Sequence, residues 1–178
     1  MVNAIHWDLI LIGTVLLLVF SWKFSIQAKR YHGIARFFAF ESLLFLIDVN
    51  SGPWFKNPTA PLQIASWFFL AASLYLVIHG VYLLVKLGKP RGDLENTSRL
   101  VTTGLYGLIR HPLYASLVYL GLGVYFKQVN GFTTLLAAVN TVALFLTARA
   151  EEGEMIAKFG EDYRRYMKAT KRFVPFLF

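Results

Sequence analysis

The sequence predicts an all-α fold, an integral membrane helical bundle of about five transmembrane helices followed by a cytoplasmic C-terminal amphipathic helix. Of the 178 residues, 56% are hydrophobic and only 16% are charged, which is too apolar for a soluble domain of this size. The apolar residues fall in five long runs. The basic residues are distributed very unevenly between the links that join these runs, and this asymmetry is typical of membrane proteins.

The five apolar runs define the expected helices. They lie at 6–24, 34–50, 62–87, 113–126 and 132–148. Because a bilayer is crossed by about 20 helical residues, the third run is comfortably long enough. The fourth would reach only about 21 Å as a straight helix, so it either stops short of the far surface or forms a hairpin with the fifth. Asn130-Gly131 is the expected tip of that hairpin.

Several classes of protein are excluded or disfavoured. The chain has no cysteine, which removes disulfide frameworks, thiolate metal sites and cysteine nucleophiles. Neither a glycine-rich phosphate loop nor a metal-ligand spacing occurs, so we expect no Rossmann domain and no metal. The first run contains Asp8 and no basic residue precedes Lys23, so we expect a retained helix rather than a cleaved signal peptide.

The placement of charge predicts the topology. Of 18 Lys and Arg residues, 16 lie in or beside the first link, the third link and the C-terminal tail, which alternating helices place on one side. Only Lys56 and Lys127 lie in the second link and at the hairpin tip. The basic side is cytoplasmic, so the N-terminus is expected outside and the C-terminus inside. Orientation and anionic membrane lipids account for the net charge of +8, so no nucleic-acid partner is needed.

The densest group of functional side chains lies directly before the fourth run. It comprises Gly104, Tyr106, Arg110, His111 and Tyr114. Pro112 suits the first position of a helix, where no amide hydrogen is needed. The helix N-terminus, with free backbone donors, would then lie beside Arg110 and His111 and could hold a carboxylate or phosphate. The alternative is an ordinary helix entrance with a snorkelling Arg, a capping His and interfacial tyrosines.

A second group, Arg149, Glu151 and Glu152, follows directly from the fifth run. Carboxylates at this depth are costly unless they have partners, and the hairpin would return them to the side that carries Arg110 and His111. The alternative is a solvated helix end. Taken together, the two groups predict one pocket with an anion-binding corner and a cation-binding corner.

Three ionisable residues inside the apolar runs, Glu41, Asp48 and His79, are weaker candidates for function. After Ala150, aromatic and apolar residues recur at helical spacing between basic ones, which predicts an amphipathic helix that Gly160 breaks.

These motifs occur in a characteristic order. Leu100-Val-x-x-Gly-x-Tyr-x-x-x-Arg-His-Pro-x-Tyr114, Glu151-Glu152, Phe159-Gly160-x-x-Tyr163-x-x-Tyr166 and Arg172-x-x-Pro175 resemble the isoprenylcysteine carboxyl methyltransferase family and its bacterial and archaeal relatives. The wider superfamily includes phospholipid N-methyltransferases. One departure is Ala115-Ser116, because many relatives have a short sequence of small residues that includes a glycine at this place. We expect a single membrane domain, 1–178, in which 1–99 forms the N-terminal helices and loop and 100–178 forms the cofactor-binding methyltransferase half.

The resemblance implies an S-adenosylmethionine site roofed by the cytoplasmic tail, with a lipophilic acceptor entering from the membrane. By position, Gly104, Tyr106, His111 and Tyr114 would line the cofactor, and Glu151 and Glu152 would bind its ribose or ammonium. Arg110 belongs to the anion-binding corner of the same pocket. Because the sulfonium is already an activated leaving group, direct in-line displacement would suffice, without a metal or a covalent intermediate.

The acceptor determines which residues are catalytic. A prenylcysteine-type carboxylate needs a cation such as Arg149, Arg110 or Arg172. An amine must instead lose a proton, for which Glu152 or Glu41 is suited. We expect the carboxylate or a related lipid, with Arg149 and Glu152 as the catalytic residues. The alternatives are a phospholipid amine N-methyltransferase, a steroid-reductase-like membrane reductase that uses a nicotinamide cofactor, and a scaffold whose basic tail binds anionic membrane lipids.

The predicted topology is tested with reporter fusions at both ends of the chain. The N-terminal fusion should report from outside and the C-terminal fusion from the cytoplasm, because the basic segments stay inside. A C-terminal reporter active only on the outer side would overturn both the topology and the cytoplasmic pocket.

Overall fold

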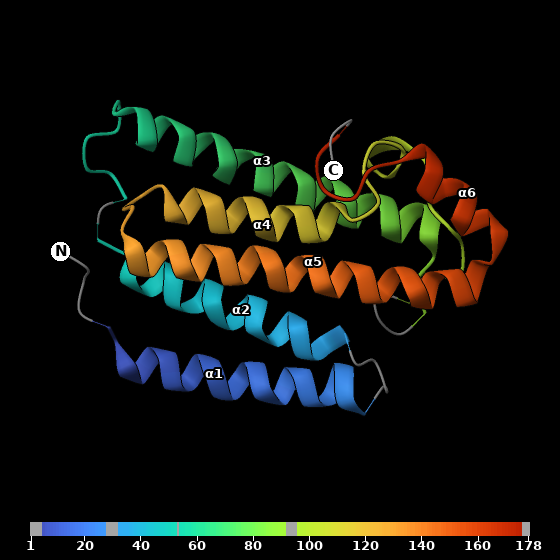
Figure 1. The fold of residues 1–178 in the computed structure, drawn as a ribbon, viewed down its shortest axis with the longest axis horizontal. Coiled ribbons are helices and arrows are strands. Elements are labelled where there is room, and N and C mark those ends of the chain that lie inside the picture. The colour runs from blue at the N-terminus through green and yellow to red at the C-terminus, as the bar shows by residue number, and fades with distance from the viewer. Residues whose placement is uncertain (1–4, 28–31, 53, 92–95, 176–178) are drawn as a thin grey trace. The chain divides into compact units, whose positions relative to one another are not determined.

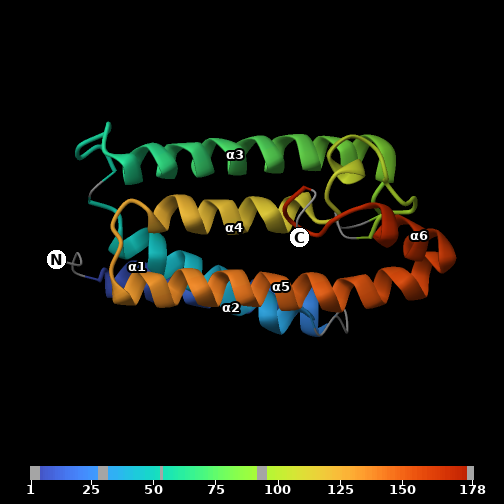
Figure 2. The same ribbon diagram turned by 45° about the horizontal axis from the view of Figure 1, so that its top comes forward.

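The computed structural model describes residues 5–27, 32–52, 54–91 and 96–175, and Figures 1 and 2 show the course of the chain in two views. Within these residues the regular structure is helical, and the extended segments form only two isolated β-bridges. The expected all-α fold is therefore confirmed.

The helices begin and end close to the expected positions, with one exception. Their bounds are α1 Trp7–Ser21, α2 His32–Val49, α3 Pro61–Leu83, α4 Pro112–Tyr125, α5 Gly131–Phe159 and α6 Glu161–Ala169. Single π-helical turns, Trp22–Ile26 and Leu84–Gly88, extend α1 and α3, and a 3₁₀ turn at Gly104–Gly107 precedes α4. Pro112 is the first residue of α4, as predicted.

The exception is the end of the fifth helix. We expected an apolar helix ending at Ala148 and a separate amphipathic helix after Ala150, but α5 continues without interruption to Phe159. The intervening residues are mostly Ala, Glu, Met and Lys, which favour a helix whether or not they are apolar. Gly160 does end it, with φ 58° and ψ −130°, and the short amphipathic α6 follows.

Three segments are long and apolar enough to cross a membrane, judged by length and composition. They are Trp7–Ser25, Pro61–Gly88 and Gly131–Phe159. The 18 residues of α2 include Arg36, Glu41 and Asp48, and α4 is a shorter apolar helix of 14 residues. That α2 and α4 also cross the membrane stays a prediction.

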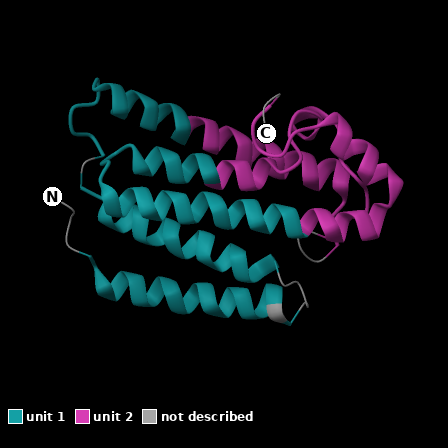
Figure 3. Cartoon of the chain, viewed as in Figure 1, with its two compact units in different colours: residues 1–70, 118–150 teal, residues 71–117, 151–178 magenta. Residues whose placement is uncertain are grey.

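The chain forms two compact units that interleave in sequence (Figure 3). The first contains residues 1–70 and 118–150, and the second contains 71–117 and 151–178. The second unit therefore unites the segment before α4 with the end of α5 and the C-terminal tail.

Neutral side chains hold the helices of the first unit together. Asn50 donates to the carbonyl of Val124 at 2.8 Å, and Ser66 donates to that of Gly123 at 2.6 Å. Asn140 in α5 donates to the carbonyl of Ala39 in α2 at 3.0 Å. Inside a bilayer the hydrophobic effect does little to bring helices together. Hydrogen bonds of this kind therefore help to stabilise helix pairs.

Two of the three weaker candidates are hydrogen-bonded within the first unit. Asp48 accepts hydrogen bonds from the backbone and the ring of His6, at 3.1 and 2.8 Å, and so satisfies a donor at the start of α1. Glu41 accepts a hydrogen bond of 2.6 Å from Thr14. Both contacts join α1 to α2, which is a structural role.

The tip between α4 and α5 is closed by reciprocal capping. The side chain of Asn130 accepts a hydrogen bond from the amide of Thr133, and the hydroxyl of Thr133 accepts one from the amide of Asn130, each at 3.0 Å. This arrangement satisfies two donors at the start of α5. Asn130-Gly131 therefore forms the tip of the hairpin, as the sequence predicts.

Gly153 and Gly160, two glycines of the second unit with space for a side chain, allow a direct test of the helix break at Gly160. A Cβ atom on either Gly160 or Gly153 would have no neighbour within 4 Å, but only Gly160 has positive φ. Gly160→Ala should destabilise the protein by about 1–3 kcal/mol through backbone strain. Gly153→Ala, in the middle of a helical segment, should stabilise it by about 0.5–1 kcal/mol. Thermal unfolding in detergent measures both, and equal Tm values for the two variants would contradict the assignment.

Candidate active site

The C-terminal segment of the second unit lies alongside the segment that leads into α4. The amide of Arg110 donates to the carbonyl of Lys171 at 2.7 Å, and that of His111 donates to the carbonyl of Arg172 at 3.2 Å. The amides of Arg110 and His111 are therefore occupied by carbonyls of the C-terminal tail. That the free backbone donors at the start of α4 itself hold an anion stays a prediction.

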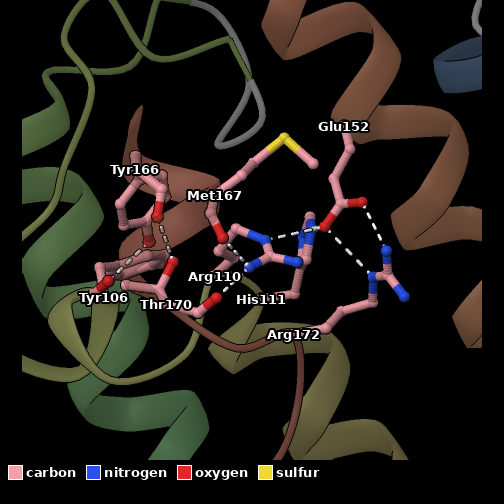
Figure 4. A network of polar contacts seen from close by, with 8 residues as sticks. All are labelled: Tyr106, Arg110, His111, Glu152, Tyr166, Met167, Thr170 and Arg172. Carbon is pink, nitrogen blue, oxygen red and sulfur yellow. Dashed lines mark hydrogen bonds and ion pairs between the residues drawn. The ribbon is translucent and has the colours of Figure 1, made fainter. Parts of the chain in front are cut away.

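The centre of the site is the buried carboxylate of Glu152, which holds two arginines (Figure 4). The Nε atom of Arg110 lies 2.9 Å from Glu152 Oε1. Arg172 binds the same carboxylate through Nε at 3.2 Å and Nη2 at 2.7 Å. The side chains of Arg110, Arg172 and Glu152 are 9%, 17% and 5% exposed, so little solvent screens these ion pairs.

Arg110 extends this network to the end of α6. Its Nη1 atom donates to the carbonyl of Met167 at 3.1 Å and also to that of Thr170 (Figure 4). Glu152, through its two arginines, thus joins α5, the segment before α4 and the C-terminal tail. The prediction that the hairpin returns the Glu pair to Arg110 and His111 is borne out by these contacts.

The ring of His111 lies beside this network with one nitrogen unused. His111 Nε2 is buried and 3.4 Å from Glu152 Oε1, but outside hydrogen-bonding geometry. The ring stacks on Tyr114, with centroids 5.5 Å apart and planes at 22°, and meets the edge of Phe173. The site therefore contains an imidazole whose orientation is fixed by its neighbours and whose Nε2 atom lies near the Glu152 carboxylate without a hydrogen bond.

A cavity of about 110 Å³ opens next to these residues, entirely within the second unit. Five of the predicted site residues line it, namely Tyr106, Arg110, His111, Tyr114 and Glu151. Further lining comes from the end of α3, the loop before the 3₁₀ turn, α4, α5 and α6, with the residues Leu84, Thr97, Leu100, Val101, Pro112, Leu113, Met155, Phe159, Tyr163 and Tyr166.

Three predicted residues do not line the cavity. Glu152 faces the arginines instead. Gly104 is exposed and has φ 62°, and a Cβ atom there would approach Leu83 to 2.8 Å, so glycine is needed for the turn. Arg149 is exposed on the part of α5 that belongs to the first unit, and the described residues offer it no ion pair.

Three tyrosines form the wall supplied by the 3₁₀ turn and α6. The hydroxyl of Tyr166 donates to the carbonyl of Tyr106 at 2.6 Å, and the ring of Tyr163 meets that of Tyr166 edge-on at 5.7 Å. Burial raises the pKa of all three hydroxyls. These tyrosines consequently stay neutral at physiological pH and offer ring faces and hydroxyl groups rather than charge.

Glu151 is the acidic residue of the cavity. No ion pair or hydrogen bond of its side chain is found within the described residues, and it is only half-buried. A carboxylate beside aromatic rings suits a ligand that carries positive charge and a flat ring. His111 adds a position for a polar contact, so the cavity combines a group for a cation with one for a hydrogen bond.

Sequence reasoning missed part of the site. Arg172 was considered only as a cation for the acceptor, whereas it completes the ion-pair network, and Tyr163 and Tyr166 line the cavity. The available signal for the two tyrosines was their spacing of three positions, which places them on one side of the amphipathic helix after Gly160. No signal in the sequence indicates that Arg172 pairs with Glu152, because 20 residues and a helix break separate them.

The comparisons with known proteins match a part of the chain that includes most of the cavity residues. The profile of the phospholipid methyltransferase family matches residues 62–162. Methanethiol S-methyltransferase 1 of Bradyrhizobium diazoefficiens is 29% identical over 121 residues, which cover 64% of this chain and 40% of that protein. Protein-S-isoprenylcysteine O-methyltransferase of Homo sapiens is 34% identical over 89 residues, covering 49% of this chain and 31% of the human protein.

A methanethiol S-methyltransferase of Pseudomonas deceptionensis is 25% identical over 118 residues, covering 62% of this chain and 42% of that protein. The aligned part thus spans less than half the length of each of these curated relatives. No solved structure matches the chain.

Matched substitutions of the adjacent residues Glu152 and Glu151 test the ion-pair network. Glu152→Gln should destabilise the protein by about 3 kcal/mol, because it removes the charge that neutralises two partly buried arginines. The partial exposure of Arg172 keeps the loss at the lower end of the usual range. Glu151→Gln, the matched control, should change stability by less than about 0.5 kcal/mol. Chemical unfolding in detergent measures both, and equal losses would argue against the network.

Proposed function

Because the chain belongs to the phospholipid methyltransferase family, we propose that it is a membrane methyltransferase that moves a methyl group from S-adenosylmethionine to a lipophilic acceptor. The observation that carries this proposal is the cavity of the second unit, where Glu151, the unused nitrogen of His111 and several aromatic rings meet. The three apolar segments and the family make the chain an integral membrane protein.

The residues of the cavity fit this cofactor in their chemistry. Glu151 would bind the ammonium group or the ribose hydroxyls, and His111 Nε2 would supply a further polar contact. The faces of Tyr106 and Tyr114 would lie against the sulfonium or the adenine. The cofactor itself supplies an activated methyl group.

We assign Glu152 a positioning role instead of the cofactor contact that the resemblance implies. Its two carboxylate oxygens already hold Arg110 and Arg172, which leaves no oxygen directed into the cavity. Those arginines hold the tail beside the start of α4 and so maintain the orientation of His111. The same pairing makes Glu152 a poor general base for an amine, because two cations stabilise its ionised form.

For the acceptor, we propose a prenylcysteine-type carboxylate or a related lipid. The named acceptor of the human relative supports this proposal, as does the exposed cation Arg149 at the end of the apolar part of α5. The methanethiol S-methyltransferases support a thiol as the second candidate, and they cover more of this chain. Neither Arg110 nor Arg172 is well suited to bind the carboxylate of the acceptor, since both are paired with Glu152.

The experiment that tests the function supplies purified protein with methyl-labelled S-adenosylmethionine. Separate reactions contain a farnesylcysteine analogue, methanethiol or phosphatidylethanolamine. Label in the farnesylcysteine ester supports the proposed acceptor, and label in one of the others identifies a different acceptor for the same site. If the cofactor does not bind and a reduced nicotinamide cofactor does, the methyltransferase proposal is overturned.

Glu151 should matter for cofactor binding more than for stability. Glu151→Gln should weaken S-adenosylmethionine binding by about 1–3 kcal/mol, because a charge-assisted contact is lost, and should leave Tm nearly unchanged. Titration calorimetry measures the affinity. Arg149→Gln is the control for a lost surface charge and should bind the cofactor normally. Undiminished affinity in folded Glu151→Gln would refute the assignment of the cavity.

A further inference from the structure

We propose that a glycerophospholipid with an anionic headgroup binds along the exposed side of α3, on a stripe formed by Tyr75, His79, Tyr82 and Lys86. Tyr75, His79 and Tyr82 are spaced by four and three positions, which places them on one side of α3. Lys86, in the π-helical turn that follows α3, joins them through its contact with Tyr82. The inference is independent of the proposed methyl transfer. None of the four residues lines the cavity of the second unit.

The stripe is continuous. The ring of His79 stacks on that of Tyr75, with centroids 5.6 Å apart and planes at 17°, and lies 6.1 Å from that of Tyr82. The ammonium of Lys86 donates to the hydroxyl of Tyr82 at 2.8 Å. These contacts fix the polar atoms in a row along the helix.

The rest of the second unit packs on another side of α3. The hydroxyl of Ser73 donates to the carbonyl of Ser116 at 2.7 Å, and Gly80 lies against Leu113 in α4. Leu76 and Leu83 are buried on the same side. By contrast, Tyr75 and Tyr82 are 58% and 52% exposed, so the stripe faces outward.

The depths of Lys86, Tyr82 and His79 in the membrane follow the order of the phosphate and ester groups of a phospholipid. Lys86 lies close to the end of the apolar segment Pro61–Gly88, and at 1.5 Å per residue Tyr82 and His79 lie about 6 and 10 Å deeper. Polar side chains that face lipid at such depth are costly unless they have partners. The Lys86 ammonium would meet the phosphate, and the Tyr82 hydroxyl and His79 ring would donate to the ester carbonyls.

Charge favours a lipid over a second copy of the chain. A symmetric dimer through this stripe would place Lys86 of one copy near Lys86 of the other, which is unfavourable. No acidic residue belongs to the stripe to relieve that repulsion. An anionic lipid satisfies the lysine, the Tyr82 hydroxyl and the His79 ring together.

The test reconstitutes the full chain in nanodiscs that contain phosphatidylglycerol and phosphatidylcholine and counts retained lipids by native mass spectrometry. The wild-type protein should retain phosphatidylglycerol preferentially, and Lys86→Gln should lower that retention about fivefold. His79→Phe keeps the stacked rings but loses the ring N–H, and it should also lower retention. Lys56→Gln, an exposed lysine that lies before α3, loses the same charge and should behave as wild type.

Two results would overturn the proposal. One is equal phosphatidylglycerol retention in Lys86→Gln, His79→Phe and Lys56→Gln. The other is efficient disulfide cross-linking of two Tyr82→Cys chains, since this would show that a second copy covers the stripe. An unchanged thermal unfolding temperature of each variant in detergent provides the check on folding. This check does not use the cofactor, so loss of the lipid is separable from failure of the proposed methyl transfer.

Discussion

The second unit depends on one constraint, which is that the buried carboxylate of Glu152 must be neutralised. Two arginines from different segments do this, Arg110 before α4 and Arg172 in the tail. A buried carboxylate without such partners would be costly, and so would either arginine without the carboxylate. Because the three residues come from separate parts of the chain, the network holds the tail, the end of α5 and the entrance of α4 together. The orientation of His111 and the closed backbone contacts of the tail follow from this arrangement.

The Glu pair acquires two different roles because it lies on a helix. Successive helical residues are rotated by about 100°, so adjacent carboxylates cannot face the same place. Glu152 turns toward the arginines and Glu151 toward the cavity. One carboxylate is consumed in holding the site, and its neighbour stays available for a ligand with positive charge. The continuation of α5 past Ala148 is what fixes this rotation.

Much of the fold could be predicted, because each signal was local. Apolar runs locate five helices, Pro112 starts one of them, and Asn130 and Gly160 mark the start and the end of another. The meeting of the Glu pair with Arg110 also followed from the hairpin. The directions in which Glu151 and Glu152 point could not be predicted. They depend on α5 continuing through a polar segment, and hydropathy does not identify such a segment as helical. The contact between the C-terminal tail and the segment before α4 could not be predicted for a related reason. Only the folded chain brings the carbonyls of Lys171 and Arg172 to the amides of Arg110 and His111.

Both units contain neutral hydrogen bonds between helices, and the second unit adds a largely buried network of ion pairs. Within the first unit, Asn50, Ser66 and Asn140 donate to helix carbonyls, and such neutral contacts suit an apolar environment where a charge would be costly. Within the second unit, ion pairs gather where α5 passes from apolar into polar sequence. A charged cofactor could reach such a boundary from water, and an acceptor with a lipid chain could reach it from the bilayer. The Glu152 network therefore lies where α5 leaves its apolar part, which is the position that the proposed methyl transfer to a membrane-bound acceptor needs.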